Sequence, residues 1–308
     1  MHNNSLEFPT TRRTGCIFSR HLKKRNKYFG VVEGFYGKPY TFAQRRDLIA
    51  FLAACALNTY VYAPKADPYH RKQWSLPYPI TMMRQFEKLI AACDQYAIHF
   101  NFALSPMVHP DVGKIIRKAK RMTRVGIRHF SLLYDDITVP LSRETACEQA
   151  YSANELLRFL TSEIKNPVLF FCPTQYRGFK KTEYLGTLSQ ELDRDIHIFW
   201  TGKYVVSKTI TARDIRKIAM LLKRKPLIWD NLFANDYIPG TILQFPYRNR
   251  SKTILRTTAG ILLNPMNQYK QSKPLIYTAA QFINDPVCYV PHRAWKKAQA
   301  ILRRHSYQ

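Results

Sequence analysis

The sequence predicts an α/β protein that forms a single TIM-type (β/α)8 barrel. Eight short apolar segments occur along the chain, and amphipathic helical patterns separate nearly all of them. The apolar segments are continuous rather than alternating, which is typical of parallel strands buried on both faces. No GxGxxG or GxxxxGK(S/T) turn is present to favour an open, nucleotide-binding sheet. The 308 residues leave ample room for a barrel of about 250 residues.

The first half of the chain supplies four of the predicted strands. They cover residues 28–37, 58–65, 98–106 and 128–136. The helices between them are predicted at 42–56, 81–97 and 111–127. In the first of these helices Leu48, Phe51, Leu52 and Cys55 share one face, which is the spacing of an amphipathic helix that packs on a core.

The second half repeats the pattern. Strands are predicted at 168–174, 196–202, 226–231 and 258–265, and helices at 145–164, 182–192, 211–224 and 274–284. The stretch between 231 and 258 has no clear periodicity. The predicted organisation is therefore a basic, disordered extension over 1–27, a barrel over 28–290 and a basic C-terminal tail over 291–308.

The net charge is strongly positive, +27 from 48 basic and 21 acidic residues. Such a charge fits weak electrostatic attraction to polyanions, although a generally basic, solvated surface is the simpler explanation. Basic residues concentrate over 114–128 (KIIRKAKRMTRVGIR), where helical spacing favours an exposed helix face over a polyanion-binding patch.

Several classes of protein are not expected. No apolar run reaches 18 residues, so we expect no membrane span. The first thirty residues lack the apolar core of a secretory signal, although a basic targeting segment is an alternative to a plain extension. The six cysteines form no CxxC pair or zinc-like cluster, and Cys55 and Cys93 are expected in the core. These features predict a cytoplasmic protein without a metal or other cofactor.

Polar and aromatic residues gather where the predicted strands end. Because the active site of a TIM barrel lies at the C-terminal ends of its strands, these residues are expected to converge. They are Glu33 to Gly37, Lys65, Asp135, Asp136, Thr174 to Tyr176, Trp200 to Gly202, Trp229 to Asn231, and Asn264. Acids, aromatics and amides without a Ser-His-Asp or Cys-His arrangement indicate a carbohydrate site.

The adjacent acids Asp135 and Asp136 are the most informative pair. Two neighbouring carboxylates repel, so one is expected to keep its proton more readily, and one site can then hold both an acid and a carboxylate. The alternative is that one of them merely caps a turn. Neighbouring strand residues point to opposite faces, so both can reach one pocket only if the chain bends there.

Eight segments, in order along the chain, carry a family resemblance. They are GVVEGFYGKPY from Gly30, NTYVYAPK from Asn58, DPYHRKQW from Asp67, SLLYDDI from Ser131, CPTQY from Cys172, WTGKYVVSK from Trp200, IWDNLFANDY from Ile228 and LNP from Leu263. The chain resembles glycoside hydrolase family 84, the O-GlcNAc hydrolases and related bacterial N-acetylglucosaminidases, from about residue 28 to about 285. An Asp-Asp pair alone would not identify this family, whereas the eight segments in this order do so specifically.

The resemblance implies a retaining β-N-acetylglucosaminidase in which the substrate's acetamido oxygen is the nucleophile and forms an oxazoline. By the match, Asp135 orients the acetamido N–H, and Asp136 is the general acid and then the general base. The resemblance also places the backbone of Gly34, together with Lys65, Asp236 and Asn264, on the sugar hydroxyls. It places Asn231 near the acetamido group and the ring, and forms the acetamido pocket from Tyr176, Trp229, Cys172 and Val205.

The sequence departs from the family pattern at Ala66, Gln175 and Tyr40, where an acid, a glutamate and a tryptophan are common. None of these is an assigned catalytic group, so activity is expected to survive. No room remains after the barrel for the helical stalk of dimeric members, so a monomer is expected. The expected partner is a glycoprotein or glycan bearing β-GlcNAc. Two alternatives stay open: an exo-hydrolase of GlcNAc-containing glycans, and a non-catalytic barrel that binds glycans or polyanions.

Overall fold

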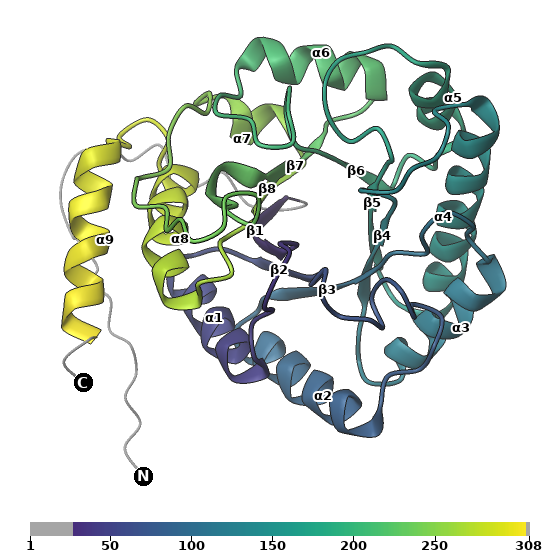
Figure 1. Ribbon diagram of the computed structural model, residues 1–308, viewed down its shortest axis with the longest axis horizontal. Helices are drawn as coiled ribbons and strands as arrows, with labels where there is room; N and C mark the ends of the chain where they lie inside the picture. Colours follow the sequence, from purple (N-terminus) through teal and green to yellow (C-terminus); the bar gives the residue numbers. More distant parts are fainter. Residues whose placement is uncertain (1–26, 306–308) are drawn as a thin grey trace.

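The computed structural model describes residues 27–305 as a closed barrel of eight parallel strands (Figure 1). Each strand pairs with the next in sequence, and β8 closes the barrel by pairing with β1. The strands are β1 Tyr28–Glu33, β2 Thr59–Tyr62, β3 His99–Leu104, β4 His129–Leu133, β5 Val168–Cys172, β6 His197–Trp200, β7 Leu227–Asp230 and β8 Gly260–Leu263. The predicted TIM-type barrel is confirmed.

The helices form a ring outside the strands (Figure 1). They are α1 Phe42–Ala54, α2 Ile80–Gln95, α3 Val112–Thr123, α4 Arg143–Glu163, α5 Glu183–Glu191, α6 Ala212–Leu222, α7 Ile254–Thr257, α8 Tyr269–Asn284 and α9 Pro291–His305, with a 3-10 turn η1 at Asn231–Phe233. Side-chain oxygens of Thr41, Ser142, Thr182 and Thr211 cap the helices that follow them. Each cap satisfies a backbone N–H that the first turn leaves without a partner.

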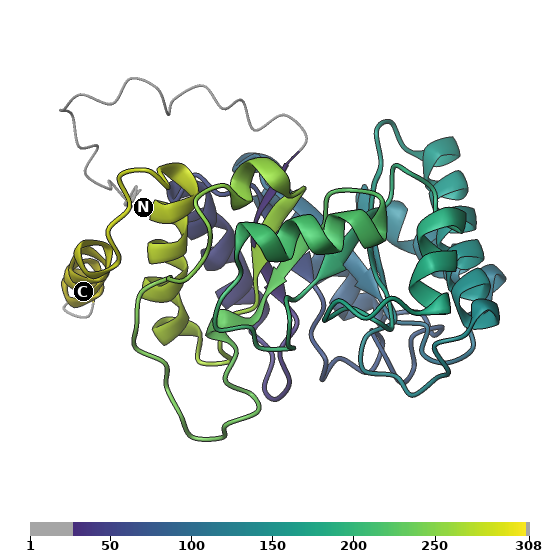
Figure 2. The ribbon, with the colours of Figure 1, turned by 90° about the horizontal axis from the view of Figure 1, so that it is seen from above.

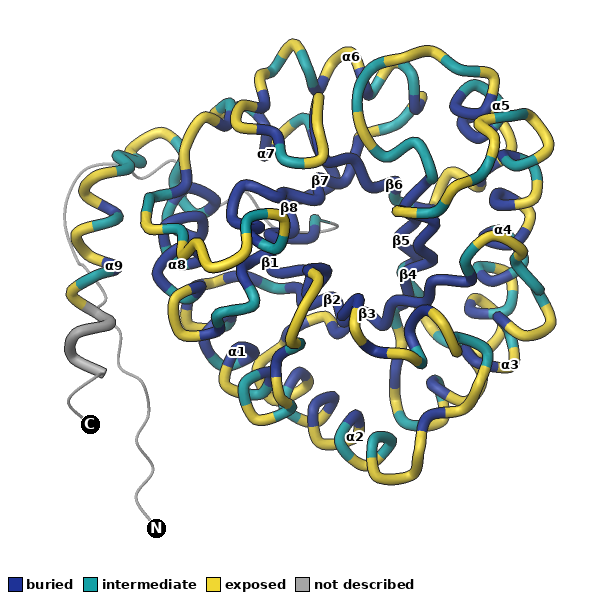
Figure 3. Tube along the Cα trace, in the orientation of Figure 1, coloured by how far each residue is buried: buried dark blue, intermediate teal, exposed yellow. Residues whose placement is uncertain are grey.

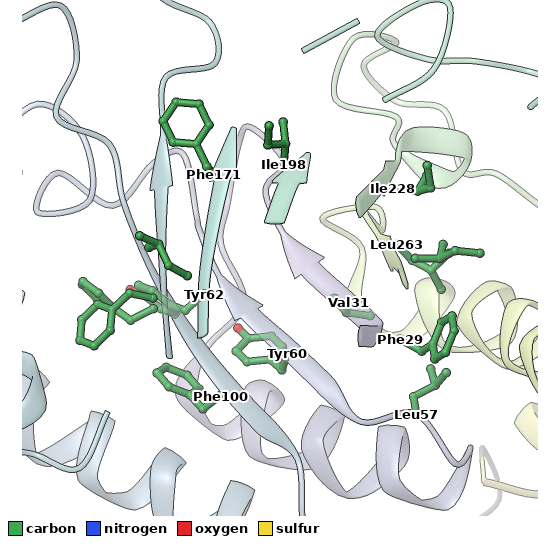
Figure 4. Packing of buried hydrophobic residues seen from close by; sticks show 14 of the residues in the cluster. Phe29, Val31, Leu57, Tyr60, Tyr62, Phe100, Phe171, Ile198, Ile228 and Leu263 are labelled. Atoms are coloured by element: carbon green, nitrogen blue, oxygen red, sulfur yellow. The ribbon is translucent and has the colours of Figure 1, made fainter. Parts of the chain in front are cut away.

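Alternate strand residues build two apolar layers. Val31, Tyr60 and Ile198 belong to the layer between barrel and helices, part of which Figure 4 shows. Val32 and Phe170 belong to a smaller cluster in the barrel interior. Strands that are buried on both faces explain the continuous apolar runs of the sequence. Figure 3 shows the result, a buried barrel wall with exposed residues on the outer turns.

Two buried ion pairs brace the ends of strands near the mouth of the barrel. Arg45 Nη2 lies 2.8 Å from Glu33 Oε1 and Arg45 Nε 2.9 Å from Oε2, so the last residue of β1 is fixed to α1. Arg250 Nε lies 2.8 Å from Asp230 Oδ2 at the end of β7. Both carboxylates are fully buried. Burying a charge is tolerated only with such partners, so Glu33 and Asp230 have structural roles.

Helix α8 begins earlier than predicted. The sequence placed its start at Pro274, since proline disfavours a helix interior. Instead the helix begins at Tyr269, and Pro274 lies inside it. Hydrogen bonds hold the turn ahead of the proline: Ser272 Oγ donates to Met266 O at 3.1 Å, and the Tyr269 hydroxyl donates to Asp47. Tertiary contacts thus outweigh the local preference.

The segment predicted as a basic C-terminal tail contains helix α9, which packs beside α8 on the outside of the ring (Figures 1 and 2). Ala294 and Ala298 are buried among the α9 side chains over 291–300. The predicted N-terminal extension lies outside the described residues apart from residue 27, and the proposed domain limits remain predictions. Within the part of the chain that the structure describes, no helix has the length and apolar character needed to span a bilayer.

Candidate active site

A cavity of about 380 Å³ opens at the C-terminal ends of the strands. All eleven residues to which the family resemblance assigns a role lie in its wall: Gly34, Lys65, Asp135, Asp136, Cys172, Tyr176, Val205, Trp229, Asn231, Asp236 and Asn264. They come from the ends of β1, β2, β5, β7 and β8 and from the loops after β4, β6 and β7. The barrel therefore brings together residues that are up to 230 positions apart in sequence.

The backbone bends where both acids enter the cavity. Asp136 has φ of 54°, in the left-handed region that non-glycine residues seldom adopt. This change of direction after β4 turns Asp136 to the same cavity as its neighbour Asp135. Asp135 is buried, whereas Asp136 is exposed at the mouth. The bend that the alternation of side chains required is therefore present, and a strained conformation of this kind is typical of functional sites.

Asp135 has one occupied and one vacant oxygen. Its Oδ2 forms an ion pair with Lys65, whose ammonium also lies 5.4 Å from the centre of the Trp229 ring. Its Oδ1 is buried and has no hydrogen-bond partner among the described residues. A buried acceptor without a partner is costly, so its persistence beside a cavity indicates a position kept for a donor on a ligand.

Asp136 is held by two phenols. Tyr36 donates to its Oδ2 and Tyr176 to its Oδ1, each at 2.8 Å. Arg71 Nη1 donates to the Tyr36 hydroxyl at 2.8 Å, and its Nη2 donates to the Asp136 carbonyl at 3.3 Å. Arg71 thus fixes both the tyrosine and the bent backbone. Burial, with the charge of Asp136, raises the pKa of Tyr36 to about 12, so the phenol keeps the proton that it donates.

Two amides link the ends of β7 and β8. Asn264 Nδ2 donates to Asn231 Oδ1 at 2.9 Å, and Asn231 Nδ2 donates to the Val205 carbonyl at 2.8 Å. Gly34 N donates to Asn264 Oδ1 at 3.2 Å, which ties β1 to the same chain of bonds. In the same part of the mouth, Asp236 Oδ2 accepts from Tyr36 N at 2.8 Å. The polar wall is therefore pre-ordered before any ligand arrives.

In the apolar wall of the cavity, the backbone of Gly34 lies close to the Trp229 ring. A Cβ on Gly34 would lie 2.2 Å from the Trp229 ring, so only glycine fits there. Trp229 packs edge-on against Phe199 at 5.1 Å between ring centres, so it is at once part of the barrel interior and part of the cavity wall. Burial raises the pKa of the Cys172 thiol well above its usual value, which suits a wall residue and not a nucleophile.

Of the other strand-end residues that were expected to converge, Tyr36 and Thr201 line the cavity, whereas Glu33, Phe35, Gly37, Thr174, Gln175, Trp200, Gly202 and Asp230 do not. Three wall residues were not singled out from the sequence: Val206, Ala234 and Tyr237. Each of these three stands within two residues of Val205 or Asp236, so proximity to those residues was the available signal. Arg71 gave no such signal, because its contact with Tyr36 joins two separate loops.

The three departures from the family pattern lie outside the cavity wall. The Tyr40 hydroxyl donates to the Met266 carbonyl at 2.6 Å, and Gln175 Nε2 donates to the Lys180 carbonyl at 2.7 Å. Ala66 is exposed. Over residues 27–305, no group of three or more His, Cys, Asp or Glu side chains has an arrangement that could hold a metal ion.

Comparison with known proteins identifies the family of the chain. A family model described as β-N-acetylglucosaminidase matches residues 29–308. The Protein O-GlcNAcases of Rattus norvegicus and Mus musculus are each 35% identical to this chain over 267 residues, which is 82% of the chain. The matched region covers 29% of the length of those relatives.

Solved structures give the same assignment. A mutant of the Thermobaculum terrenum O-GlcNAc hydrolase superposes with a TM-score of 0.85 at 34% identity, over 89% of this chain and 63% of its own. CpGH84B superposes with a TM-score of 0.82 at 30% identity, over 89% of this chain and 51% of its own. With a family model that spans nearly all of the described residues, this chain belongs to the β-N-acetylglucosaminidase family, glycoside hydrolase family 84.

Proposed function

We propose that the chain is a retaining β-N-acetylglucosaminidase that removes terminal β-linked GlcNAc with the help of the substrate's own acetamido group. One observation carries the proposal: the buried, unpartnered Oδ1 of Asp135 lies in the same cavity as the phenol-held carboxyl of Asp136. The first is an acceptor suited to an amide N–H. The second, at the open mouth, is placed for a leaving-group oxygen.

In the first step, Asp135 Oδ1 accepts the acetamido N–H and increases the nucleophilicity of the acetamido oxygen. The ion pair with Lys65 holds the other oxygen of Asp135 in position. The acetamido oxygen attacks the anomeric carbon, the bond to the glycosidic oxygen breaks, and Asp136 gives its proton to that oxygen. The products are an oxazolinium ion whose N–H stays hydrogen-bonded to Asp135, a protonated leaving group and the Asp136 carboxylate.

In the second step, the Asp136 carboxylate removes a proton from a water molecule at the mouth. The water oxygen attacks the anomeric carbon, the bond from that carbon to the oxazoline oxygen breaks, and the acetamido group is restored. Two inversions give overall retention. The Tyr36 and Tyr176 phenols remain donors throughout, so they hold Asp136 in place while its charge changes.

The remaining wall residues are assigned to the sugar. One ammonium donor of Lys65 bonds Asp135, and we assign its other donors to a sugar hydroxyl. We also assign the backbone of Gly34 and the side chains of Asp236 and Asn264 to sugar hydroxyls. Trp229, Tyr176, Cys172 and Val205 are assigned to the acetamido pocket, and Asn231 to the region between pocket and ring. Because named relatives are protein O-GlcNAcases, GlcNAc on Ser or Thr of proteins is the preferred substrate and free GlcNAc glycans the alternative.

Turnover of an aryl β-N-acetylglucosaminide is the direct test. The unmodified chain should release the aryl group, and a trapped product should keep the β configuration. Asp135→Asn should reduce this turnover, whereas Asp94→Asn, an exposed carboxylate on α2, should leave it unchanged. No turnover by correctly folded protein would instead favour a non-catalytic barrel. Equal rates on glycoproteins and chitin oligomers would remove the preference for proteins.

Binding to long acidic polymers is proposed as a separate, electrostatic property. The net charge of +27 supports it, and the exposed basic residues of α3 are one source. Because such binding releases counterions, it should weaken steeply as salt is added. Nucleic-acid binding that is insensitive to salt would contradict this.

A further inference from the structure

Exposed basic side chains occur in four of the eight loops at the mouth end of the barrel. Lys38, Lys72, Arg177 and Lys203 are all exposed, and they belong to the loops after β1, β2, β5 and β6. Three of them lie within two residues of a wall residue, and Lys72 follows Arg71, which holds Tyr36. Because the strands are parallel, these four loops emerge at the same end of the barrel.

Exposed apolar side chains accompany these charges. Tyr36, Tyr204 and Tyr237 are 45%, 55% and 58% exposed, although two of them also line the cavity. The ammonium of Lys203 lies 5.2 Å from the centre of the Tyr204 ring. Large apolar groups gathered at the edge of a cavity, rather than scattered singly, are typical of a surface that contacts a partner.

Little negative charge offsets the basic residues. In the loops after β1, β2, β5 and β6 the sequence contains a single acid, Asp67, which is buried and accepts from the Tyr62 and Tyr78 hydroxyls at 2.7 Å. Asp136 and Asp236 belong to other loops and face the cavity, where both bind Tyr36. The sugar site is thus acidic and the surface around it basic and aromatic.

We propose that this mouth surface selects GlcNAc carried on extended, acidic polypeptide segments. The proposal rests on the function proposed above and specifies its substrate class. A GlcNAc in the cavity places its linked Ser or Thr at the mouth, so the flanking residues lie over the tyrosines and the basic side chains. At 0.1 M salt charges interact over about 10 Å, which is the reach of the residues on either side of the sugar. Tyrosine rings tolerate many sequences, whereas the cations discriminate by charge.

The test compares three glycopeptides that differ only in the residues flanking a GlcNAc-Ser: Asp and Glu, Asn and Gln, or Lys. The expected order of kcat/KM is acidic, then neutral, then basic, with the acidic peptide about tenfold above the neutral one at low ionic strength. The preference should shrink at high salt. An uncharged aryl β-N-acetylglucosaminide serves as the reference for catalysis without a peptide.

Two matched variants separate the mouth from the protein's overall charge. The mouth variant combines Lys38→Gln, Lys72→Gln, Arg177→Gln and Lys203→Gln. The distant variant combines Arg124→Gln, Arg128→Gln, Lys165→Gln and Lys225→Gln, which are exposed in the connections at the opposite end of the barrel. Each variant lowers the formal charge of +27 by four, so only the location differs.

The mouth variant should lose most of the preference for the acidic peptide and keep its rate on the aryl glycoside, and the distant variant should keep both. The proposal is overturned if the unmodified chain shows no preference, or if both variants lose it equally. Failure of the proposed function looks different, since the unmodified chain would not turn over the aryl glycoside. In that case fluorescence anisotropy of the labelled acidic and neutral peptides would still test the mouth surface, because binding requires no cleavage. Tighter binding of the acidic peptide would support the proposal, and equal binding would overturn it.

Discussion

At the C-terminal end of the barrel the strands carry Lys65, Asp135 and Asn264 into an open cavity, whereas at the N-terminal end the same sheet begins with packed rings. Tyr28 of β1 lies 5.0 Å from His197 of β6 and 6.3 Å from His99 of β3, measured between ring centres. His99 in turn lies 5.3 Å from His129 of β4. At the mouth the unpartnered Asp135 Oδ1 faces an open cavity. At the floor His129 Nδ1 also has no hydrogen-bond partner within residues 27–305, but its ring is packed against another ring rather than facing a cavity.

The two ends of the barrel also differ in the charge of their buried ionisable groups. Burial lowers the pKa values of His129 and His197 to about 4, so both floor imidazoles are neutral near pH 7. At the mouth, Lys65 and Asp135 are instead kept as an ion pair. The C-terminal ends of the strands therefore carry the candidate active site, and their N-terminal ends are packed against one another. We expect substitutions at the mouth to change activity and substitutions at the floor to change stability.

The largest effect is expected from the two acids at the mouth. Asp136→Asn should nearly abolish cleavage of alkyl or Ser-linked GlcNAc and should spare aryl glycosides, whose leaving groups need little protonation. Asp135→Asn should slow all substrates, because the acetamido nucleophile needs its partner in every case. Each loss should be about 10²-fold or more in kcat/KM on the sensitive substrates.

A series of glycosides with leaving groups of increasing acidity measures this difference. A steep dependence for Asp136→Asn with a shallow one for Asp135→Asn supports the assigned roles, and the reverse would exchange them. If neither substitution mattered, the Asp-Asp pair would be only a turn. Thermal unfolding should be compared alongside, since the Asp135 substitution also leaves Lys65 without its anionic partner.

A smaller effect is expected from the close approach in the apolar wall. Gly34→Ala places a methyl group 2.2 Å from the Trp229 ring, which must move, and with it the acetamido pocket. We expect kcat/KM on the aryl glycoside to fall about tenfold, as misplacement of a binding group by a fraction of an ångström does. Gly186→Ala on α5, where a Cβ meets nothing within 4 Å, is the control. Equal rates for the two variants would remove Trp229 from the pocket.

A further step down is expected for Arg71, which acts through Tyr36 and the Asp136 backbone. Arg71→Met should lower kcat on alkyl glycosides several-fold and aryl glycosides less, because it loosens only the group that protonates the leaving oxygen. Arg71→Lys should restore part of the loss, since an ammonium can still donate to Tyr36. A uniform loss on all substrates would mean that Arg71 merely supports the loop.

The sequence was sufficient for the barrel and for the convergence of several strand-end residues on one cavity. Continuous apolar runs mark strands that are buried on both faces, and polar residues directly after them must meet at the mouth. Hence Lys65 and Asn264, each at or just after a strand, were predicted correctly to lie in one cavity with the acids. The local sequence pattern predicts this convergence because the strand that precedes each residue fixes the end of the barrel at which the residue lies.

Other features depend on contacts between distant segments and could not be predicted. The alternation of side chains required a bend at the two acids, but neither the φ of 54° at Asp136 nor the unpartnered Oδ1 of Asp135 follows from the identity of these residues. The start of α8 ahead of Pro274 requires the bonds of Ser272 and Tyr269. The histidines at strand starts are visible in the sequence, but only barrel closure brings β1, β3 and β6 together below the core.

The smallest effect on activity, and a clear one on stability, is expected from the floor. In the folded state the pKa values of His129 and His197 lie at about 4, against about 6.5 in an unfolded chain. Between these values the unfolded state binds more protons, so the free energy of unfolding rises with pH. The contribution is fully present above pH 6.5 and is lost as the pH falls towards 4.

Urea unfolding at pH 7.5 and pH 5 measures this loss. Replacing both imidazoles with His129→Phe and His197→Phe removes the groups that must take up protons, so the difference in free energy of unfolding between the two pH values should shrink. We expect on the order of 1 kcal/mol for each histidine, after allowance for the partial exposure of the rings. His292→Phe on α9, an exposed position, should leave the difference unchanged. Activity on the aryl glycoside at pH 7 should be the same in all three proteins, because neither the rings nor the space that they fill reaches the mouth. A floor variant that lost activity at pH 7 while remaining folded would show that the two ends of the barrel are coupled through the strands that they share.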